Sequence, residues 1–132
     1  MDLIITFPGG RKVDAEYKGH TIKTDQAVHA GGENSAPAPF DYFLASIGTC
    51  SGIYVVDFCQ NRGIPFEGIR IVQRMKRDPE KKMISLISLD IEVPPDFPEK
   101  YKKSLVRVVD LCTVKKHIVD PPEFAIHVVE RS

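Results

Sequence analysis

The stretch "FLASIGTCSGIYVVDF", residues 43–58, decides how this chain folds. It is apolar over most of its length, with Ser, Gly and Thr gathered at its centre. Upstream, Pro39 suits the first turn of a helix, and Asp41 would lie near the positive end of that helix. With Gly63 as the stop signal, we predict one long helix over residues 39–62.

This predicted helix is apolar nearly all round, and such a helix must be buried on most sides. The chain has 132 residues, which suits one domain with one core, residues 1–132. A domain of this size has little room to bury a long helix on every face. We therefore expect a second copy of the chain to cover it, in a homodimer.

The composition excludes some classes of function. Lys and Arg number 18, as do Asp and Glu, so the net charge is zero and a general nucleic-acid binder, which needs a basic surface, is not expected. No segment looks long and apolar enough for a membrane span, and the start "MDLIITFPGG" has no basic region of a signal peptide. We expect a cytoplasmic protein with no membrane partner, whose three cysteines rest as thiols.

Segments on either side of the helix alternate apolar and polar residues, as strands do. Residues 3–7 and 11–17 flank "PGG" and predict a hairpin, and "GHTIKTD" a third short strand. The Gly-, Ser- and Pro-rich residues 26–39 indicate a loop. Residues 69–76 and 83–93 predict a second hairpin.

The last part of the chain predicts one more helix and one more strand. Helical spacing of apolar residues runs over 98–112, and "TVKKHI" either continues that helix or begins a short turn. "FAIHVV", residues 124–129, is expected to be a strand. Because strands and helices are grouped rather than strictly alternating, we predict an α+β fold with antiparallel sheets around the long helix.

Three cysteines could carry chemistry or fill the core. Small residues around Cys50 either let the helix pack closely or leave room for a ligand at a reactive thiol. Cys59 lies on about the opposite face of the helix and is expected in the core. Cys112 lies on the apolar side of the second helix, so the two apolar elements could bring it near Cys50.

Other polar residues give weaker signals. A zinc site from Cys50, Cys112, His29 and His117 has no recognised ligand spacing, so no metal is expected. His29 could act as general base for acyl transfer by a thiol, as an alternative reaction. Arg11 near a thiol would favour its thiolate, although an arginine in a turn is normally a surface residue.

The segments "NSAPAPFDYFLASIGTCSGIYVVDF" (34–58) and "VVDLCTVKKHI" (108–118), preceded by "GGEN" (31–34), resemble the OsmC/Ohr-like family, named after osmotically inducible protein C and organic hydroperoxide resistance protein. The resemblance covers most of the chain and implies an intertwined homodimer with its sites at the subunit interface. It implies a thiol-dependent peroxidase that uses no cofactor. Cys50 would attack a hydroperoxide and become a sulfenic acid, and Cys112 would condense with it to a disulfide. An external thiol or dithiol, lipoyl groups in the organic-hydroperoxide branch, would then reduce that disulfide.

Two positions depart from the pattern of the organic-hydroperoxide branch. Where that branch has Glu, ten residues before the first Cys, this chain has Phe40, and Thr113 replaces a common Pro. An uninterrupted helix would place Asp41 about 13 Å from Cys50 at ~1.5 Å per residue. These departures favour the broader OsmC-like group over the organic-hydroperoxide branch.

The resemblance also suggests the residues that assist the thiol. Arg11 in "GGRKV" resembles an arginine that partners the thiolate, and Asp41 or Glu33 is the candidate carboxylate. The alternative function is a non-catalytic or redox-sensing module that keeps the fold and its thiols.

Overall fold

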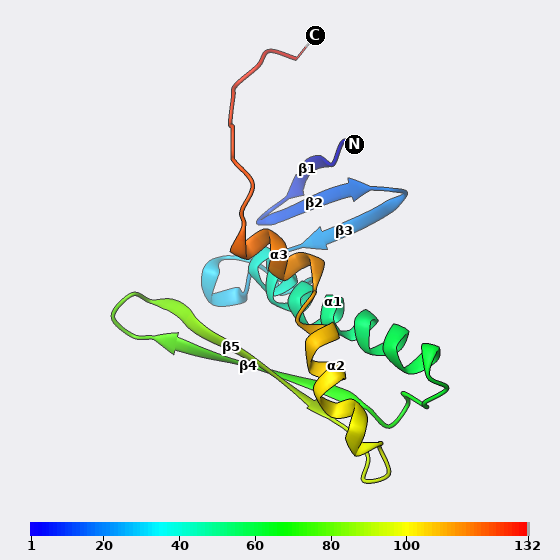
Figure 1. Ribbon diagram of the computed structural model, residues 1–132. Coiled ribbons are helices and arrows are strands. Elements are labelled where there is room, and N and C mark those ends of the chain that lie inside the picture. Colours follow the sequence, from blue (N-terminus) through cyan, green and yellow to red (C-terminus); the bar gives the residue numbers. More distant parts are fainter. Residues whose placement is uncertain (132) are drawn as a thin grey trace. The chain divides into compact units, whose positions relative to one another are not determined.

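The computed structural model describes residues 1–131 and has the predicted α+β composition, with antiparallel strands and helices (Figure 1). The elements in chain order are β1 (Ile4–Gly9), β2 (Lys12–Tyr17), β3 (His20–Thr24), the 3-10 turn η1 (Val28–Ala30), α1 (Pro39–Asn61), β4 (Arg70–Asp78), β5 (Met83–Glu92), the 3-10 turn η2 (Glu99–Tyr101), α2 (Lys102–Val109) and α3 (Thr113–Val119). The chain divides into two compact units, with the boundary between Ser46 and Ile47 inside α1.

The first unit contains the predicted three-stranded sheet. Strands β1, β2 and β3 are antiparallel neighbours in that order, so two consecutive hairpins form a meander. Gly9 and Gly10 take positive φ angles of 143° and 59° at the first turn, a conformation that "PGG" permits and most residues resist. The predicted hairpin and the third short strand are both confirmed.

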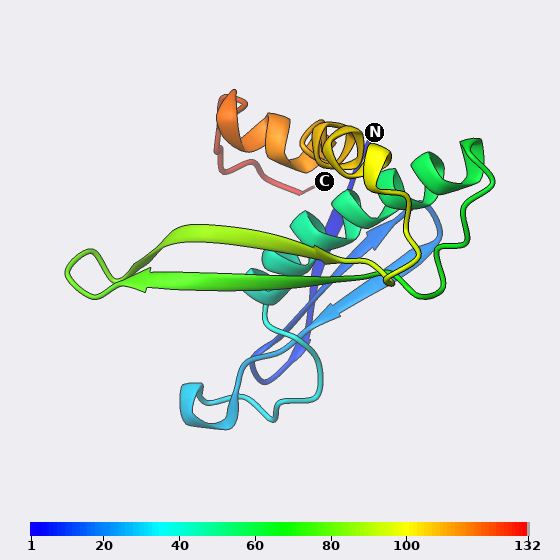
Figure 2. The same cartoon turned by 60° about the horizontal axis from the view of Figure 1, so that its bottom comes forward.

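In the second unit, β4 and β5 form the second predicted hairpin. The two strands are antiparallel, and Asp78 and Met83 are the last paired residues before the connecting turn. Its register shifts between Lys76 and Arg77, where a bulge bends the ribbon. Figure 2 shows that the far end of this hairpin extends beyond the helices of the same unit. The ladder places Ile71 opposite Ile91 on the face that meets the core.

Helix α1 is uninterrupted from Pro39 to Asn61, close to the range predicted from sequence. It ends where Gly63 takes a left-handed φ of 64°. Its buried residues are Ile47, Ser51 and Val55, at intervals of four, and Phe58 and Cys59, which follow Val55 by three and four residues and continue the same stripe. Within a single copy of the chain α1 is therefore fully buried along one stripe only, and apolar residues outside it, including Phe40, Phe43 and Ile53, are exposed.

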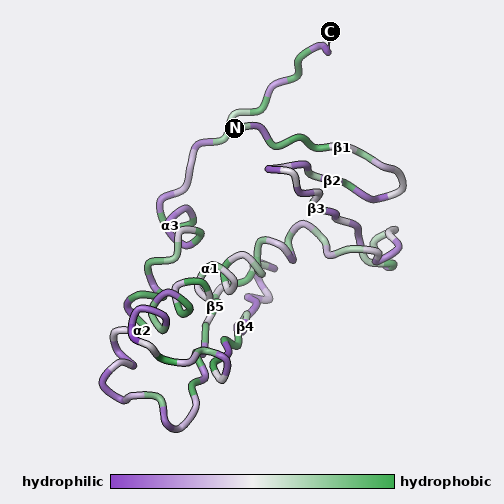
Figure 3. Tube along the Cα trace, turned by 90° about the vertical axis from the view of Figure 1, so that its right-hand side faces the viewer, coloured by the Kyte–Doolittle hydropathy of each residue, from purple (hydrophilic) through white to green (hydrophobic). Residues whose placement is uncertain are grey.

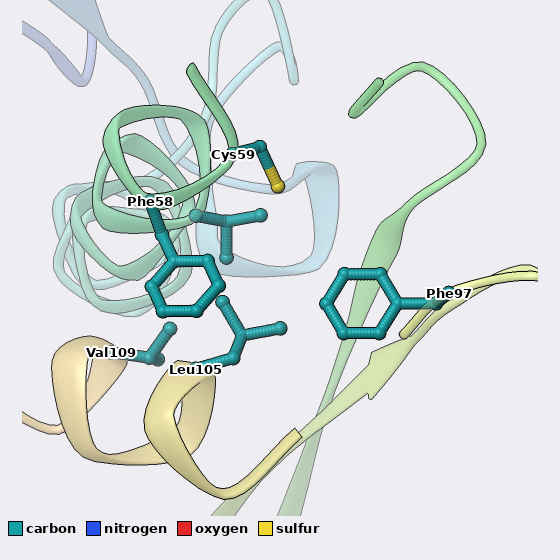
Figure 4. Close-up of a cluster of buried hydrophobic side chains, with 6 residues drawn as sticks. Phe58, Cys59, Phe97, Leu105 and Val109 are labelled. Carbon is teal, nitrogen blue, oxygen red and sulfur yellow. The ribbon is translucent and has the colours of Figure 1, made fainter. Parts of the chain in front are cut away.

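The core of the second unit lies between α1 and α2. Phe58 points toward Leu105 and Val109 on α2, and Phe97 closes the cluster from the segment before α2 (Figure 4). Cys59 is fully buried in this cluster, as predicted from its face of the helix. This packing holds the last turns of α1 against α2.

The helix predicted over 98–112 is shorter in the structure. The turn η2 precedes α2, the helix stops at Val109, and Asp110 and Leu111 form a turn before the separate helix α3. "TVKKHI" therefore begins a new helix rather than continuing α2. This break puts Cys112 at the N-cap of α3 instead of inside a helix.

The prediction of a strand at residues 124–129 is wrong for a single copy of the chain. Residues 120–131 contain neither helix nor strand, and the trace runs away from α3 with alternating hydropathy along its length (Figure 3). Phe124, Ile126 and Val128 are 86%, 91% and 100% exposed. A strand requires a neighbour for its backbone hydrogen bonds, and the described residues of one copy supply none here.

One expectation from the sequence needs correction. By length and composition alone, α1 could cross a membrane, although a core helix of a water-soluble protein passes the same test. The sequence analysis expected no segment to pass this test of length and apolar composition, and α1 does pass it, which by itself does not make α1 a membrane span.

Candidate functional site

Cys50 lies in the middle of α1, and the start of α3 lies over it. The backbone amides of Val114 and Thr113 and the side chain of Cys112 all form hydrogen bonds with the Cys50 sulfur. Cys50 is partly exposed, whereas Cys112 is only 1% exposed. Both thiols are free, so the structure represents the reduced state of this pair.

This surrounding favours the charged form of Cys50. The hydrogen bond from the Val114 amide lowers the pKa of Cys50, and those from Cys112 and the Thr113 amide lower it further, against a partial burial that raises it. A thiolate is the reactive form of cysteine toward electrophiles. By contrast, burial raises the pKa of Cys59, so the three cysteines differ in chemistry as well as in position.

The break between α2 and α3 creates this arrangement. A helix that continued past Val109 would use the amide groups of residues 113 and 114 for its own hydrogen bonds. At the start of a new helix these amides have no partner within the helix and can donate to the sulfur. Thr113 matters here, because the Pro that is common at this position in the resembled family has no N–H to donate.

A second contact joins the same two elements. The hydroxyl groups of Tyr54 and Thr113 lie 3.3 Å apart, within hydrogen-bond distance. Tyr54 follows Cys50 by one helical turn, so both side chains of α1 meet the first residue of α3. The sequence analysis does not predict this hydroxyl contact, because no local sequence pattern signals it.

The small residues near Cys50 serve different purposes. A Cβ added at Gly48 would lie 2.6 Å from Oε1 of Gln73 on β4, so Gly48 allows close packing of helix on strand. A Cβ at Gly52 would meet nothing within 4 Å. Close packing thus explains Gly48, whereas the space beside Gly52 is open in this copy of the chain.

A cavity of about 750 Å³ lies in the second unit beside Cys112. Its walls come mainly from β5, α2 and α3, with Ile47 and Ser51 from α1. Most of the wall is aliphatic, and Lys115 and Asp110, which form an ion pair, are among its polar members. The cavity has the size and polarity to hold an apolar organic group.

The loop of the first unit is organised around Asp25, which is 1% exposed. Its carboxylate accepts hydrogen bonds from the Ser35 hydroxyl at 2.6 Å and from the amides of Ser35 and Gln26 at 3.0 and 2.7 Å. These bonds, that of the Ser35 hydroxyl first, hold the pKa of Asp25 far below its usual range. The amide of Glu33 also donates to this carboxylate, at 3.3 Å.

The carboxylate candidates already have partners. Glu33 forms a 3.0 Å ion pair with Lys12 and is 74% exposed. Asp41 accepts a hydrogen bond from the Ala38 amide at 2.9 Å, which makes it a helix-start residue as well as a candidate. Arg11 lies beside Gly31 in the same unit, with its Cγ 3.9 Å from the position of a Cβ there. Their roles toward Cys50 stay predictions.

The residues proposed for other chemistry lie elsewhere. His29 belongs to η1 in the first unit. Nδ1 of His117 donates a hydrogen bond to the Thr113 carbonyl within α3, at 2.7 Å. Among residues 1–131, no group of three or more His, Cys, Asp or Glu side chains is arranged to hold a metal ion.

This chain is similar to known proteins both in sequence and in fold. The family model described as OsmC-like protein matches residues 32–127. A protein assigned to osmotic stress and detoxification responses in Psychrobacter arcticus is 21% identical, with a TM-score of 0.68 and coverage of 86% of this chain and 85% of that one. An organic hydroperoxide resistance protein OsmC from Legionella pneumophila is 20% identical, with a TM-score of 0.57 and 89% coverage of both chains. An OsmC-like protein of unknown function from Vibrio cholerae is 11% identical, with a TM-score of 0.61 and coverage of 87% and 90%. The curated proteins give no match.

Proposed function

Because this chain belongs to the OsmC-like family, we propose that it is a thiol-dependent peroxidase that reduces organic hydroperoxides. One observation carries the proposal: the thiol of Cys112 and two backbone amides all bond to the Cys50 sulfur and lower its pKa. The Legionella pneumophila relative is named for organic hydroperoxide resistance, which agrees with this chemistry.

The first step is attack by the Cys50 thiolate on the O–O bond of a hydroperoxide. The sulfur takes one oxygen as a sulfenic acid, the O–O bond breaks, and the other oxygen leaves as an alkoxide that takes a proton to become an alcohol. The amides of Val114 and Thr113 keep the thiolate populated before the attack. No cofactor or metal is needed for this step.

The second step uses Cys112. Its thiol condenses with the sulfenic acid, an S–S bond forms, and the sulfenic oxygen leaves as water. Since Cys112 already forms a hydrogen bond with the Cys50 sulfur, only a local movement is required. An external dithiol then reduces the Cys50–Cys112 disulfide by two thiol–disulfide exchanges and is itself oxidised to a disulfide. The apolar cavity beside Cys112 suits organic rather than strongly polar reactants.

The active form in this proposal is an intertwined homodimer built from one OsmC-like domain per chain. Support comes from apolar surface that one copy leaves exposed, including Phe40 and Ile53 on α1, at 55% and 53%. The exposed segment 124–129 supports the same form, because its alternating residues suit a strand in the sheet of a second copy. Removing residues 121–132 is expected to convert the dimer to monomer in light scattering, and an unchanged mass would argue against this exchange.

Arg11 is proposed to stabilise the Cys50 thiolate, and Asp41 or Glu33 to orient that arginine, each from either subunit. The Lys12–Glu33 ion pair and the hydrogen bonds that the Asp25 carboxylate accepts hold the loop that carries Glu33 in one conformation. Cytoplasmic location is part of the same proposal, because a thiol pair that must be re-reduced fits a reducing compartment.

Turnover of cumene hydroperoxide with dithiothreitol tests the function. The wild type should consume the peroxide continuously, Cys50→Ser should be inactive, and Cys112→Ser should give one turnover followed by slow reduction. Cys59→Ser is the matched control, since Cys59 is a buried thiol apart from the reacting pair. Equal peroxide consumption by wild type and Cys50→Ser would refute the proposal. A single oxidation to the disulfide without turnover would instead indicate the redox-sensing alternative.

A further inference from the structure

The start of α3 delivers two amides to Cys50, yet α3 itself is weakly anchored. None of its residues from Thr113 to Val119 is buried. The buried residue nearest to its start is Cys112, at the N-cap. A short helix without buried side chains gains little from packing, so specific contacts must fix where its first amides point.

The hydroxyl contact between Tyr54 and Thr113 is suited to this task. Thr113 meets α1 at two points: its amide bonds to the sulfur of Cys50, and its hydroxyl lies 3.3 Å from the hydroxyl of Tyr54. Cys50 and Tyr54 are one turn apart on the same rigid helix. Two attachment points one turn apart fix the orientation of the α3 start, whereas one point would leave it free to pivot.

We propose that the Tyr54–Thr113 hydrogen bond is a positioning contact of the thiol site, which holds the first amides of α3 on the Cys50 sulfur. Tyr54 is therefore a positioning residue that acts on Cys50 through Thr113. Hydrogen bonds weaken steeply when distance or angle departs from the optimum, so loss of the second attachment point weakens the bonds to sulfur. The consequence for turnover rests on the peroxidase function proposed above, but the state of the thiol can be measured without any peroxide.

Alkylation of Cys50 by iodoacetamide across pH 5 to 9, followed by mass spectrometry of its peptide, tests the contact. Tyr54→Phe and Thr113→Val should each shift the midpoint to higher pH. They should lower the alkylation rate at pH 6 about three- to tenfold, the range expected when a hydrogen bond to a charged group is weakened. Thr113→Ser keeps the hydroxyl and should retain the wild-type profile.

Tyr42→Phe is the matched control. Tyr42 also lies on α1 and donates its hydroxyl, but to the Lys23 carbonyl at 2.7 Å. Its loss should leave the Cys50 profile unchanged. If Tyr54→Phe and Thr113→Val fold normally and keep the wild-type midpoint, or if Tyr42→Phe shifts the midpoint equally, the positioning role is overturned.

The outcome for the proposed function is separate. A wild type that does not consume peroxide, together with a midpoint shift in Tyr54→Phe, would refute the peroxidase and retain the positioning contact. An active wild type, together with identical alkylation profiles in all variants, would support the peroxidase and refute the positioning contact.

Discussion

The close approach of the Gln73 side chain on β4 to Gly48 on α1 lets us predict how a methyl group added at Gly48 changes stability. A Cβ at Gly48 would lie 2.6 Å from Oε1 of Gln73, whereas ordinary contact begins at 3.4 Å, so a gap of 0.8 Å must open in Gly48→Ala. The substitution gains about 1 kcal/mol of helix propensity. Overpacking costs about 1–3 kcal/mol, and the flexible end of Gln73 places this case near the lower value.

The two contributions nearly cancel, so Gly48→Ala alone should leave the free energy of unfolding unchanged or lower it by up to about 1 kcal/mol. In a Gln73→Ala background the clash is absent, and the same substitution should raise the free energy of unfolding by about 1 kcal/mol. The coupling between the two sites is thus about 1–2 kcal/mol. Urea denaturation of the four proteins at one protein concentration measures it, since a dimer's stability depends on concentration.

Gly52→Ala provides the control on the same helix. A Cβ at Gly52 meets nothing within 4 Å, so its substitution should be stabilising in both backgrounds. The reasoning fails if Gly48→Ala has the same effect with and without Gln73. Alkylation of Cys50 in the single variant gives a second readout, because a displaced α1 would also displace the sulfur from the amides of α3.

Three further predictions concern the thiol, the core and the loop. The rate of hydroperoxide reduction should rise with pH and reach half its maximum below the ordinary thiol pKa of about 8.5, since the pKa of Cys50 is lowered and only the thiolate reacts; a stopped-flow midpoint at or above that value would contradict the site geometry. Leu105→Ala, at a residue 2% exposed, should lower the free energy of unfolding by about 2–5 kcal/mol in urea denaturation, whereas Val106→Ala beside it, 61% exposed, should change it by less than about 0.5 kcal/mol. The folded-state pKa of Asp25 is lowered, so its stabilisation is complete above the unfolded pKa of about 4 and is lost as pH falls further. Melting temperatures measured at pH 5 and pH 3 should therefore differ more for wild type than for Asp25→Asn, and equal differences would exclude a special role of this carboxylate.

Periodicity and stop signals in the sequence determined most of the secondary structure. The hairpins, the long helix and its end near Gly63 follow from local rules, because turn glycines and alternating side chains act within a few residues. The buried position of Cys59 also followed from the sequence, since a helix of known period assigns its residues to faces.

Only the tertiary structure decided the surroundings of the thiol. The break between α2 and α3, the amides of Thr113 and Val114 at Cys50, and the contact of Tyr54 with Thr113 depend on how separate elements meet. The strand expected at residues 124–129 is absent for the same reason, since no neighbouring strand pairs with it within residues 1–131 of one copy of the chain. A pattern predicts that a segment can be a strand or a thiol can be reactive, but backbone hydrogen bonds between elements far apart in sequence decide whether it is.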